Sequence, residues 1–190
     1  MKRRMTHAVT RKLRISATAF SVALLALLIT AVGVSAAANS QLAQHHVGLC
    51  IDVPGFSKVQ GVQVQLYACN GGANQQWTEI PFCFGSSTYC NNVAMIQNKN
   101  SGLCLNVSGG RTANFTPAIQ WACDPTASNE VFKVMPSVYG PPNWILKSGI
   151  GTCLDDPGLS AKSGTKLEFY QCNRSEAQIW RSTSAWVGVM

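Results

Sequence analysis

Charged side chains are scarce in this sequence of 190 residues: they make up 12% of it, and only 8 of them are acidic. With 46% hydrophobic residues, the chain is too apolar to be disordered, because disordered chains combine low hydrophobicity with high net charge. Long hydrophobic runs are also absent after the first 40 residues, which excludes a multi-span membrane protein. About 150 residues follow that N-terminal region, enough for one domain with a proper core.

The net charge of +7 would favour an acidic partner such as nucleic acid, but its position argues otherwise. Six basic residues lie in the first fourteen positions: Lys2, Arg3, Arg4, Arg11, Lys12 and Arg14. The rest of the chain has nine basic residues against all 8 acidic ones, a net charge of +1. We therefore expect no nucleic-acid partner.

The N-terminal region has the three-part pattern of a secretory signal peptide. An uncharged apolar run from Ala17 to Ala38 follows the basic start and ends in small residues, so we predict a signal peptide at residues 1–38, cleaved near Ala38. The run is just long enough to be an uncleaved transmembrane anchor, but no basic stop-transfer cluster follows it. The prediction is therefore a secreted, extracellular protein with no membrane contact after cleavage.

Eight cysteines all lie after this leader, and an even number in a small exported domain indicates disulfide bonds. Zinc binding is disfavoured because there is no Cys-x2-Cys pair and because His45 and His46 precede every cysteine. We expect no metal and no other cofactor.

The cysteine spacing shows a threefold internal repeat. Three pairs of cysteines are each separated by 19 positions: Cys50 and Cys69, Cys104 and Cys123, and Cys153 and Cys172. Similar segments surround the first cysteine of each pair, at 48–52, 102–106 and 151–155, and others follow the second, at 74–77, 129–132 and 177–180. Such a repeat indicates one structural unit used three times.

Each repeat is predicted to consist of short strands. Segments such as 49–53 and 62–68 are rich in β-favouring residues, and Gly, Pro, Asn and Ser interrupt the chain at short intervals. One repeat cannot bury its own apolar face, so the three must share a core. We predict a single all-β domain at residues 45–188, with repeats at about 45–82, 92–136 and 142–188.

The repeat also predicts the disulfide bonds. The expected pairs are Cys50–Cys69, Cys104–Cys123 and Cys153–Cys172, each adding about 3 kcal/mol in the chain-entropy model. By elimination Cys83 pairs with Cys90, closing a loop that the other repeats lack.

These motifs resemble the ricin-type β-trefoil lectins, whose repeats begin with Gly-x-Cys-x-Asp and end with Gln-x-Trp. The resemblance implies a twelve-stranded β-trefoil with pseudo-threefold symmetry, and it covers nearly all of the chain after the leader. It also implies that Trp77, Phe132 and Trp180 lie in the core and do not touch a ligand.

The resemblance further implies a shallow sugar site on each repeat. A carboxylate accepts charge-assisted hydrogen bonds from sugar hydroxyls, an aromatic ring stacks on the apolar face of the sugar, and an amide both donates and accepts. The first repeat has all three parts. Its predicted carbohydrate-binding residues are Asp52, Gln65, Tyr67, Asn74 and Gln75.

The other two repeats have incomplete sites. The second repeat has Trp121 and Asn129, but Asn106 replaces the acid, which weakens or alters the site. The third repeat has Asp155 and Tyr170, but Ala177 stands where the amide is expected, and Asn173 and Glu168 are the candidates to compensate for it. Weak single sites would gain affinity on polymeric glycans through effective concentration.

Signals for catalysis are absent. His45 and His46 are expected in a solvated N-terminal tail, and the strand neighbours Asp155 and Asp156 point to opposite faces, which disfavours a glycosidase pair. The prediction is therefore a monomeric, non-catalytic protein that binds galactose- or xylose-type glycans. The alternative is a trefoil that binds a protein or inhibits a hydrolase through the Cys83–Cys90 loop.

Overall fold

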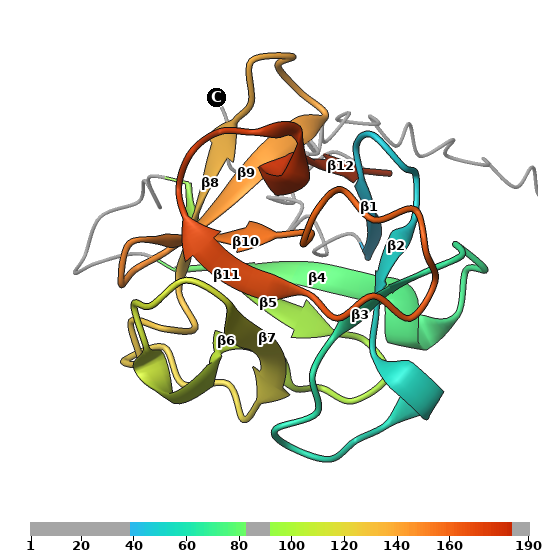
Figure 1. Ribbon diagram of the computed structural model, residues 1–190. Coiled ribbons are helices and arrows are strands. Elements are labelled where there is room, and N and C mark those ends of the chain that lie inside the picture. The colour runs from blue at the N-terminus through green and yellow to red at the C-terminus, as the bar shows by residue number, and fades with distance from the viewer. Residues whose placement is uncertain (1–38, 83–91, 184–190) are drawn as a thin grey trace, which may run out of the picture. The chain divides into compact units, whose positions relative to one another are not determined.

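The regular secondary structure of the described residues is nearly all short β-strands, joined by loops and turns (Figure 1). The computed structural model describes residues 39–82 and 92–183, and within these ranges it contains twelve strands and four one-turn 3-10 helices but no α-helix. The strands of the first repeat are β1 (Ser40–Gln44), β2 (Cys50–Asp52), β3 (Gln65–Tyr67) and β4 (Gln76–Pro81). Those of the second are β5 (Val93–Asn98), β6 (Cys104–Val107), β7 (Thr116–Trp121) and β8 (Phe132–Pro136). Those of the third are β9 (Asn143–Ser148), β10 (Thr152–Asp155), β11 (Glu168–Gln171) and β12 (Trp180–Ser182).

Six strands form a closed ring. The first and last strands of each repeat contribute to it: β1 pairs with β4 and β12, β5 with β4 and β8, and β9 with β8 and β12, all antiparallel. Closure gives every ring strand a neighbour on both sides, so the ring has no free edge. The ring is therefore a six-stranded barrel built equally from the three repeats.

The remaining six strands form one hairpin per repeat: β2–β3, β6–β7 and β10–β11. Neighbouring hairpins are joined by the antiparallel pairs Gln63 with Ile119, Gln65 with Lys166 and Glu168 with Pro117. A six-stranded barrel with a triplet of hairpins is the β-trefoil, so the predicted fold is confirmed.

Glycine turns shape the hairpins just after the predicted site residues. The 3-10 helices η1 (Pro54–Phe56) and η3 (Ser108–Gly110) follow β2 and β6, and the third repeat has a turn at the same place. Gly55, Gly109 and Gly158 occupy equivalent positions with φ of 62°, 61° and 71°. A residue with a side chain is disfavoured in this left-handed region, which explains why all three repeats have glycine there.

The shared core contains the three aromatic residues that end the repeat motif. Trp77, Phe132 and Trp180 are fully buried in one cluster, as predicted. Trp77 Nε1 donates a hydrogen bond of 3.0 Å to the Ile51 carbonyl, and Trp180 Nε1 donates one of 3.1 Å to the Leu154 carbonyl. Each indole thus ties the last strand of its repeat to the second strand.

Three predicted disulfide bonds are present. They join Cys50 to Cys69, Cys104 to Cys123 and Cys153 to Cys172, each across a separation of 19 residues. Each holds the start of one hairpin strand to the end of its partner. The predicted Cys83–Cys90 bond lies outside the described residues.

The N-terminal boundary of the domain was predicted too late in the chain. The domain was expected to start at residue 45, but β1 begins at Ser40 and pairs with β4 and β12. The expectation that His45 lies in a solvated tail is also wrong. Its Nδ1 lies 2.8 Å from Asn143 Oδ1, and its ring stacks on Tyr139 with 4.6 Å between centroids.

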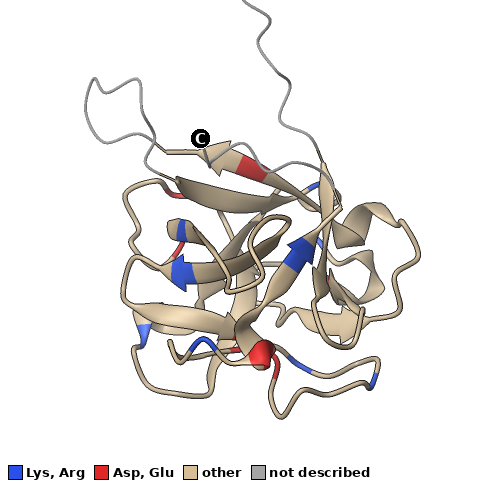
Figure 2. Ribbon diagram, turned by 90° about the horizontal axis from the view of Figure 1, so that it is seen from above, with Lys and Arg blue, Asp and Glu red and all other residues tan. Residues whose placement is uncertain are grey.

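Charged side chains are scattered over the described part of the chain. Figure 2 shows Lys, Arg, Asp and Glu separated along the ribbon, without a continuous stripe of either sign in that view. No helix within 39–82 or 92–183 is long and apolar enough to cross a membrane.

Candidate functional site

Each hairpin places three positions of the repeat on one face. The acid position lies at the end of the first hairpin strand, or one residue before it in the second repeat. Its cross-strand partner lies opposite, and an aromatic ring follows two residues after that partner. Because side chains alternate along a strand, the partner and the ring point the same way. The three sets are Asp52, Gln65 and Tyr67; Asn106, Ile119 and Trp121; and Asp155, Glu168 and Tyr170.

In the first repeat the structure brings together the predicted residues around the Asp52 carboxylate. Gln65 Nε2 donates to Oδ1 at 3.0 Å, while Asn74 Nδ2 and Gln75 Nε2 donate to Oδ2 at 2.6 and 3.2 Å. Asn74 and Gln75 belong to the 3-10 helix η2 (Ala73–Gln75), just before β4. Tyr67 is 42% exposed on the same hairpin, so its ring is open to a ligand.

Gln75 differs from its predicted role as a sugar contact. Its side chain is fully buried, and its Nε2 is shared between Asp52 Oδ2 and the Ala68 carbonyl at 3.0 Å. Its Oε1 accepts a hydrogen bond of 2.8 Å from the Asn70 backbone. Gln75 therefore holds the acid against the hairpin loop and cannot reach a ligand itself. The equivalent Gln178 makes the same kinds of bond in the third repeat.

In the second repeat the acid and the amide have exchanged places. Asn106 Nδ2 donates a hydrogen bond of 2.6 Å to Glu130 Oε1, and Glu130 Oε2 accepts one of 2.7 Å from the Asp124 backbone. Asn129 Nδ2 donates to Asn106 Oδ1 at 3.2 Å. The carboxylate is thus buried, and burial raises the pKa of Glu130. Trp121, 44% exposed, stands beside a neutral amide here.

The third repeat has the most open acid. Asp155 Oδ2 accepts one hydrogen bond, of 3.0 Å, from Gln178 Nε2 in the 3-10 helix η4 (Glu176–Gln178). Ala177 occupies the place of Asn74 and supplies no side-chain donor. The Asp52 carboxylate accepts three side-chain hydrogen bonds and that of Asp155 only one, so Asp155 retains more capacity for a ligand.

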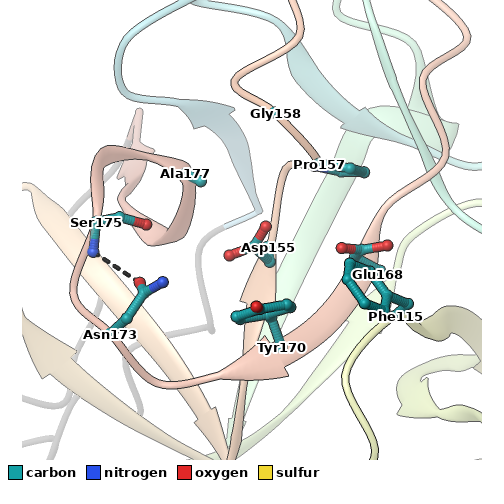
Figure 3. Close-up of a pocket in the computed structure, with 9 residues that line it drawn as sticks. All are labelled: Phe115, Asp155, Pro157, Gly158, Glu168, Tyr170, Asn173, Ser175 and Ala177. Atoms are coloured by element: carbon teal, nitrogen blue, oxygen red, sulfur yellow. Dashed lines mark hydrogen bonds between the residues drawn. The ribbon is translucent and has the colours of Figure 1, made fainter.

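A pocket of about 250 Å³ opens over Asp155 (Figure 3). Asp155 lies in the middle, with Asn173, Ser175 and Ala177 on one side and Glu168 on the other. The remaining lining residues are Phe115, Pro157, Gly158 and Tyr170. Carboxylates, amide and aromatic rings thus converge on one hollow, as expected of a small-ligand site.

The two acids that line the pocket and the neighbouring Asp156 all have raised pKa values. Burial raises the pKa of Asp155, while the hydrogen bond from Gln178 opposes the shift. Burial, followed by repulsion from Asp155 and Asp156, raises the pKa of Glu168. Asp156 lies behind them in the core, and its burial above all raises the pKa to about 6. Across 39–82 and 92–183, no group of three His, Cys, Asp or Glu residues is arranged to hold a metal ion.

Several residues of the third site were missed by the motif comparison. Phe115 comes from the second repeat, in the loop before β7, and its ring meets Tyr170 edge-on with 5.3 Å between centroids. Its φ of 66° is unusual for a bulky side chain. The equivalent positions of the other repeats are Gly61 and Gly164, so no repeated aromatic residue marks Phe115. Glu168 was a sequence-based candidate to compensate for the missing amide, but its place directly opposite Asp155 follows from the strand pairing.

Comparison with known families gives one assignment. The sequence profile of the family described as ricin-type beta-trefoil lectin domain-like matches residues 32–121 and 82–149, together more than half of the chain. The match ends before β10, so the third site lies outside the matched residues.

Solved structures share the fold at low sequence identity. The designed threefold-symmetric protein ThreeFoil is 23% identical, with a TM-score of 0.68, covering 77% of this chain and 99% of its own. The Macrolepiota procera ricin B-like lectin, solved in complex with lactose, is 18% identical with a TM-score of 0.62, covering 80% and 99%. The exo-beta-1,3-galactanase 1,3Gal43A from Clostridium thermocellum is 20% identical with a TM-score of 0.68, covering 77% of this chain but only 30% of the enzyme.

Proposed function

The chain belongs to the ricin-type β-trefoil lectin-like family, and from that premise we propose that it is a non-catalytic protein that binds carbohydrate. Its ligands are glycans, held in shallow sites on the hairpins of the first and third repeats. The second repeat contributes less, because a neutral amide replaces the acid beside Trp121.

The observation that carries this proposal is the position of Asp155 and Tyr170 in one pocket (Figure 3). The Asp155 carboxylate can accept hydrogen bonds from two neighbouring hydroxyls, while the half-buried Tyr170 ring offers an apolar surface for the sugar ring. Asn173 adds an amide at the pocket wall. These groups can bind a ligand that is rich in hydroxyl groups.

The proposed ligands are galactose- or xylose-type sugars. The lactose complex of the Macrolepiota procera lectin supports a galactose-containing ligand, since that protein has the same fold along nearly its whole length. The scattered charges of the domain (Figure 2) agree with an uncharged polymer as the overall partner.

A glycan array on the purified protein tests the proposal. The wild-type protein should bind galactose- or xylose-containing glycans, and Tyr170→Ala combined with Tyr67→Ala should lose most of that signal. Val138→Ala is a control, because Val138 is exposed and lines neither hairpin site. Absence of wild-type binding to all glycans and to insoluble polysaccharides would contradict the proposal.

Export and a monomeric state complete the proposal. The predicted leader at residues 1–38 supports secretion, as do three disulfide bonds in the domain. Mass spectrometry of protein exported by an expressing cell would show cleavage near Ala38, and size-exclusion chromatography would show one chain per particle. The alternative function through the Cys83–Cys90 loop concerns residues outside the described ranges.

A further inference from the structure

The third-repeat pocket differs from the first-repeat site in its electrostatic character. Glu168 lies directly opposite Asp155 in the hairpin, at the position that Gln65 occupies opposite Asp52. Two carboxylates therefore line the third pocket where the first site has one carboxylate and an amide. Like charges that face each other across strands are unfavourable unless a cation compensates them.

No lysine or arginine is among the described residues that line the third pocket. In the first repeat Lys166 Nζ donates a hydrogen bond of 3.0 Å to Gln65 Oε1, which places a positive charge beside that site. In the third repeat burial raises the pKa of Glu168, and the negative charges of Asp155 and Asp156 raise it further. Asp155 is 7% exposed, and within residues 39–82 and 92–183 its Oδ1 accepts no hydrogen bond. That oxygen belongs to a side chain that lines the pocket (Figure 3).

A third acid adds to the negative potential at the pocket. Asp156 is fully buried at the position that Val53 and Val107 occupy in the other repeats. Its Oδ1 accepts a hydrogen bond of 3.2 Å from the Ser160 backbone, but its buried Oδ2 has no partner. An acid in place of an apolar core residue costs stability, so the third repeat has a feature that packing alone does not explain.

The aromatic walls suit a cation as well. Phe115 is 69% exposed and meets Tyr170 edge-on, so two ring surfaces border the carboxylates. The faces of aromatic rings attract cations, and they also pack against the apolar face of a pyranose. The pocket therefore combines the groups for a sugar ring with a surplus of negative charge.

We propose that the third-repeat pocket selects sugars that carry a protonated amine, such as a 2-amino-2-deoxyhexose, over neutral sugars. The ammonium group lies between Asp155 and Glu168 and supplies the hydrogen-bond donors that Ala177 lacks, and the sugar ring packs on Tyr170. The inference rests on the proposed carbohydrate binding of this site. A metal ion is disfavoured, because the described acids are not arranged as a metal-binding group.

Nuclear magnetic resonance titration of the isotopically labelled protein separates the sites. The probes are galactosamine, galactose and N-acetylgalactosamine, which differ at a single position of the ring. The backbone amides of Gly158 and Ser175 report on the third pocket, and that of Gly72 reports on the first site. Galactosamine should shift the third-pocket amides at roughly five- to tenfold lower concentration than galactose does, and this preference should shrink as salt is raised.

Glu168→Gln is the decisive variant. It places in the third repeat the amide that Gln65 provides in the first, so the preference for galactosamine over galactose should fall at least threefold. Asp124→Asn is the matched control, since it removes one exposed negative charge in the second repeat. If both sugars shift the third-pocket amides equally, the inference fails and the proposed function stands. If no sugar shifts them, the proposed function of this pocket fails. If calcium chloride alone shifts the third-pocket amides more strongly than galactosamine does, the pocket binds a metal ion and the inference of an amine ligand is wrong.

Discussion

Asn106 Nδ2 donates a hydrogen bond of 2.6 Å to Glu130 Oε1, which reverses the direction of the equivalent bond from Gln75 to Asp52 in the first repeat. The acid and the amide have exchanged positions between β6 and Glu130, which lies two residues before β8 and 24 positions after Asn106. Each substitution alone would leave either two amides or two acids in contact. Together they keep the bond and move the negative charge from the ligand face into the interior.

This exchange predicts a compensating pair of mutations. Asn106→Asp alone places a second carboxylate against the buried Glu130 and should cost about 2 kcal/mol of unfolding free energy. Adding Glu130→Gln recreates the first-repeat arrangement and should recover most of that loss. Urea denaturation of the two single variants and the double variant measures the coupling. Equal destabilisation by the single and double variants would contradict the interpretation.

The same double variant should gain ligand binding. With an acid at 106, Trp121 and Asn129 complete a site like that of the first repeat. In a glycan-binding assay we expect the double variant to bind more strongly than the wild type, and more so after Tyr67→Ala removes the first site. If the double variant binds no more strongly than its parent, with or without Tyr67→Ala, the missing acid does not explain the weakness of the second site.

Tyr67→Ala should separate binding from stability. The ring is exposed, so its loss should change the unfolding free energy by less than about 0.5 kcal/mol while it weakens binding at the first site. Asp52→Ala should differ, because two buried amide donors and the half-buried Gln65 lose their acceptor, which should cost the fold about 2 kcal/mol or more. Thermal unfolding and glycan binding of both variants distinguish the two roles. Comparable destabilisation by both would place Tyr67 in the core instead.

Asp156 predicts a pH-dependent stability. Its pKa in the folded protein is raised to about 6, so the folded state binds its proton more tightly than the unfolded state does. The wild type should therefore lose stability relative to Asp156→Asn as the pH rises from about 4 to about 7, by about 2 kcal/mol in total. Urea denaturation at pH 4 and pH 7.5 tests this. The contributions of Asp155 and Glu168 are present in both proteins and largely cancel in this comparison. If the stability difference between wild type and Asp156→Asn does not change with pH, the raised pKa of Asp156 is refuted.

Trp180→Phe tests the role of the core indoles. Phe132 already fills the equivalent place in the second repeat, so the smaller ring should be accepted by the core. The variant loses the hydrogen bond of 3.1 Å to the Leu154 carbonyl and part of the packing, which should cost about 1–3 kcal/mol. Trp180→Ala should cost about 3–5 kcal/mol. Chemical denaturation measures the unfolding free energy of both variants. If Trp180→Phe and Trp180→Ala lose nearly the same amount, an aromatic ring at this position contributes little to stability.

The amino-acid sequence by itself determined the repeat, the strand content and three disulfide bonds. These depend on patterns within one repeat: cysteines at a constant spacing, β-favouring segments between glycine turns, and an aromatic residue at the same place in each unit. Local patterns of this kind specify hairpins, and threefold repetition specifies a shared core around Trp77, Phe132 and Trp180.

Only the tertiary structure decided the character of each site. The partner of an acid lies across the hairpin, so the pairing of Asp155 with Glu168 depends on strand register. The ring of Phe115 reaches Tyr170 from another repeat, 55 positions earlier in the chain. Burial turned Gln75 from a predicted ligand contact into a support for Asp52, since a side chain enclosed on all sides can position a neighbour but cannot touch a ligand. Register, neighbouring repeats and burial are non-local, and no single motif contains them.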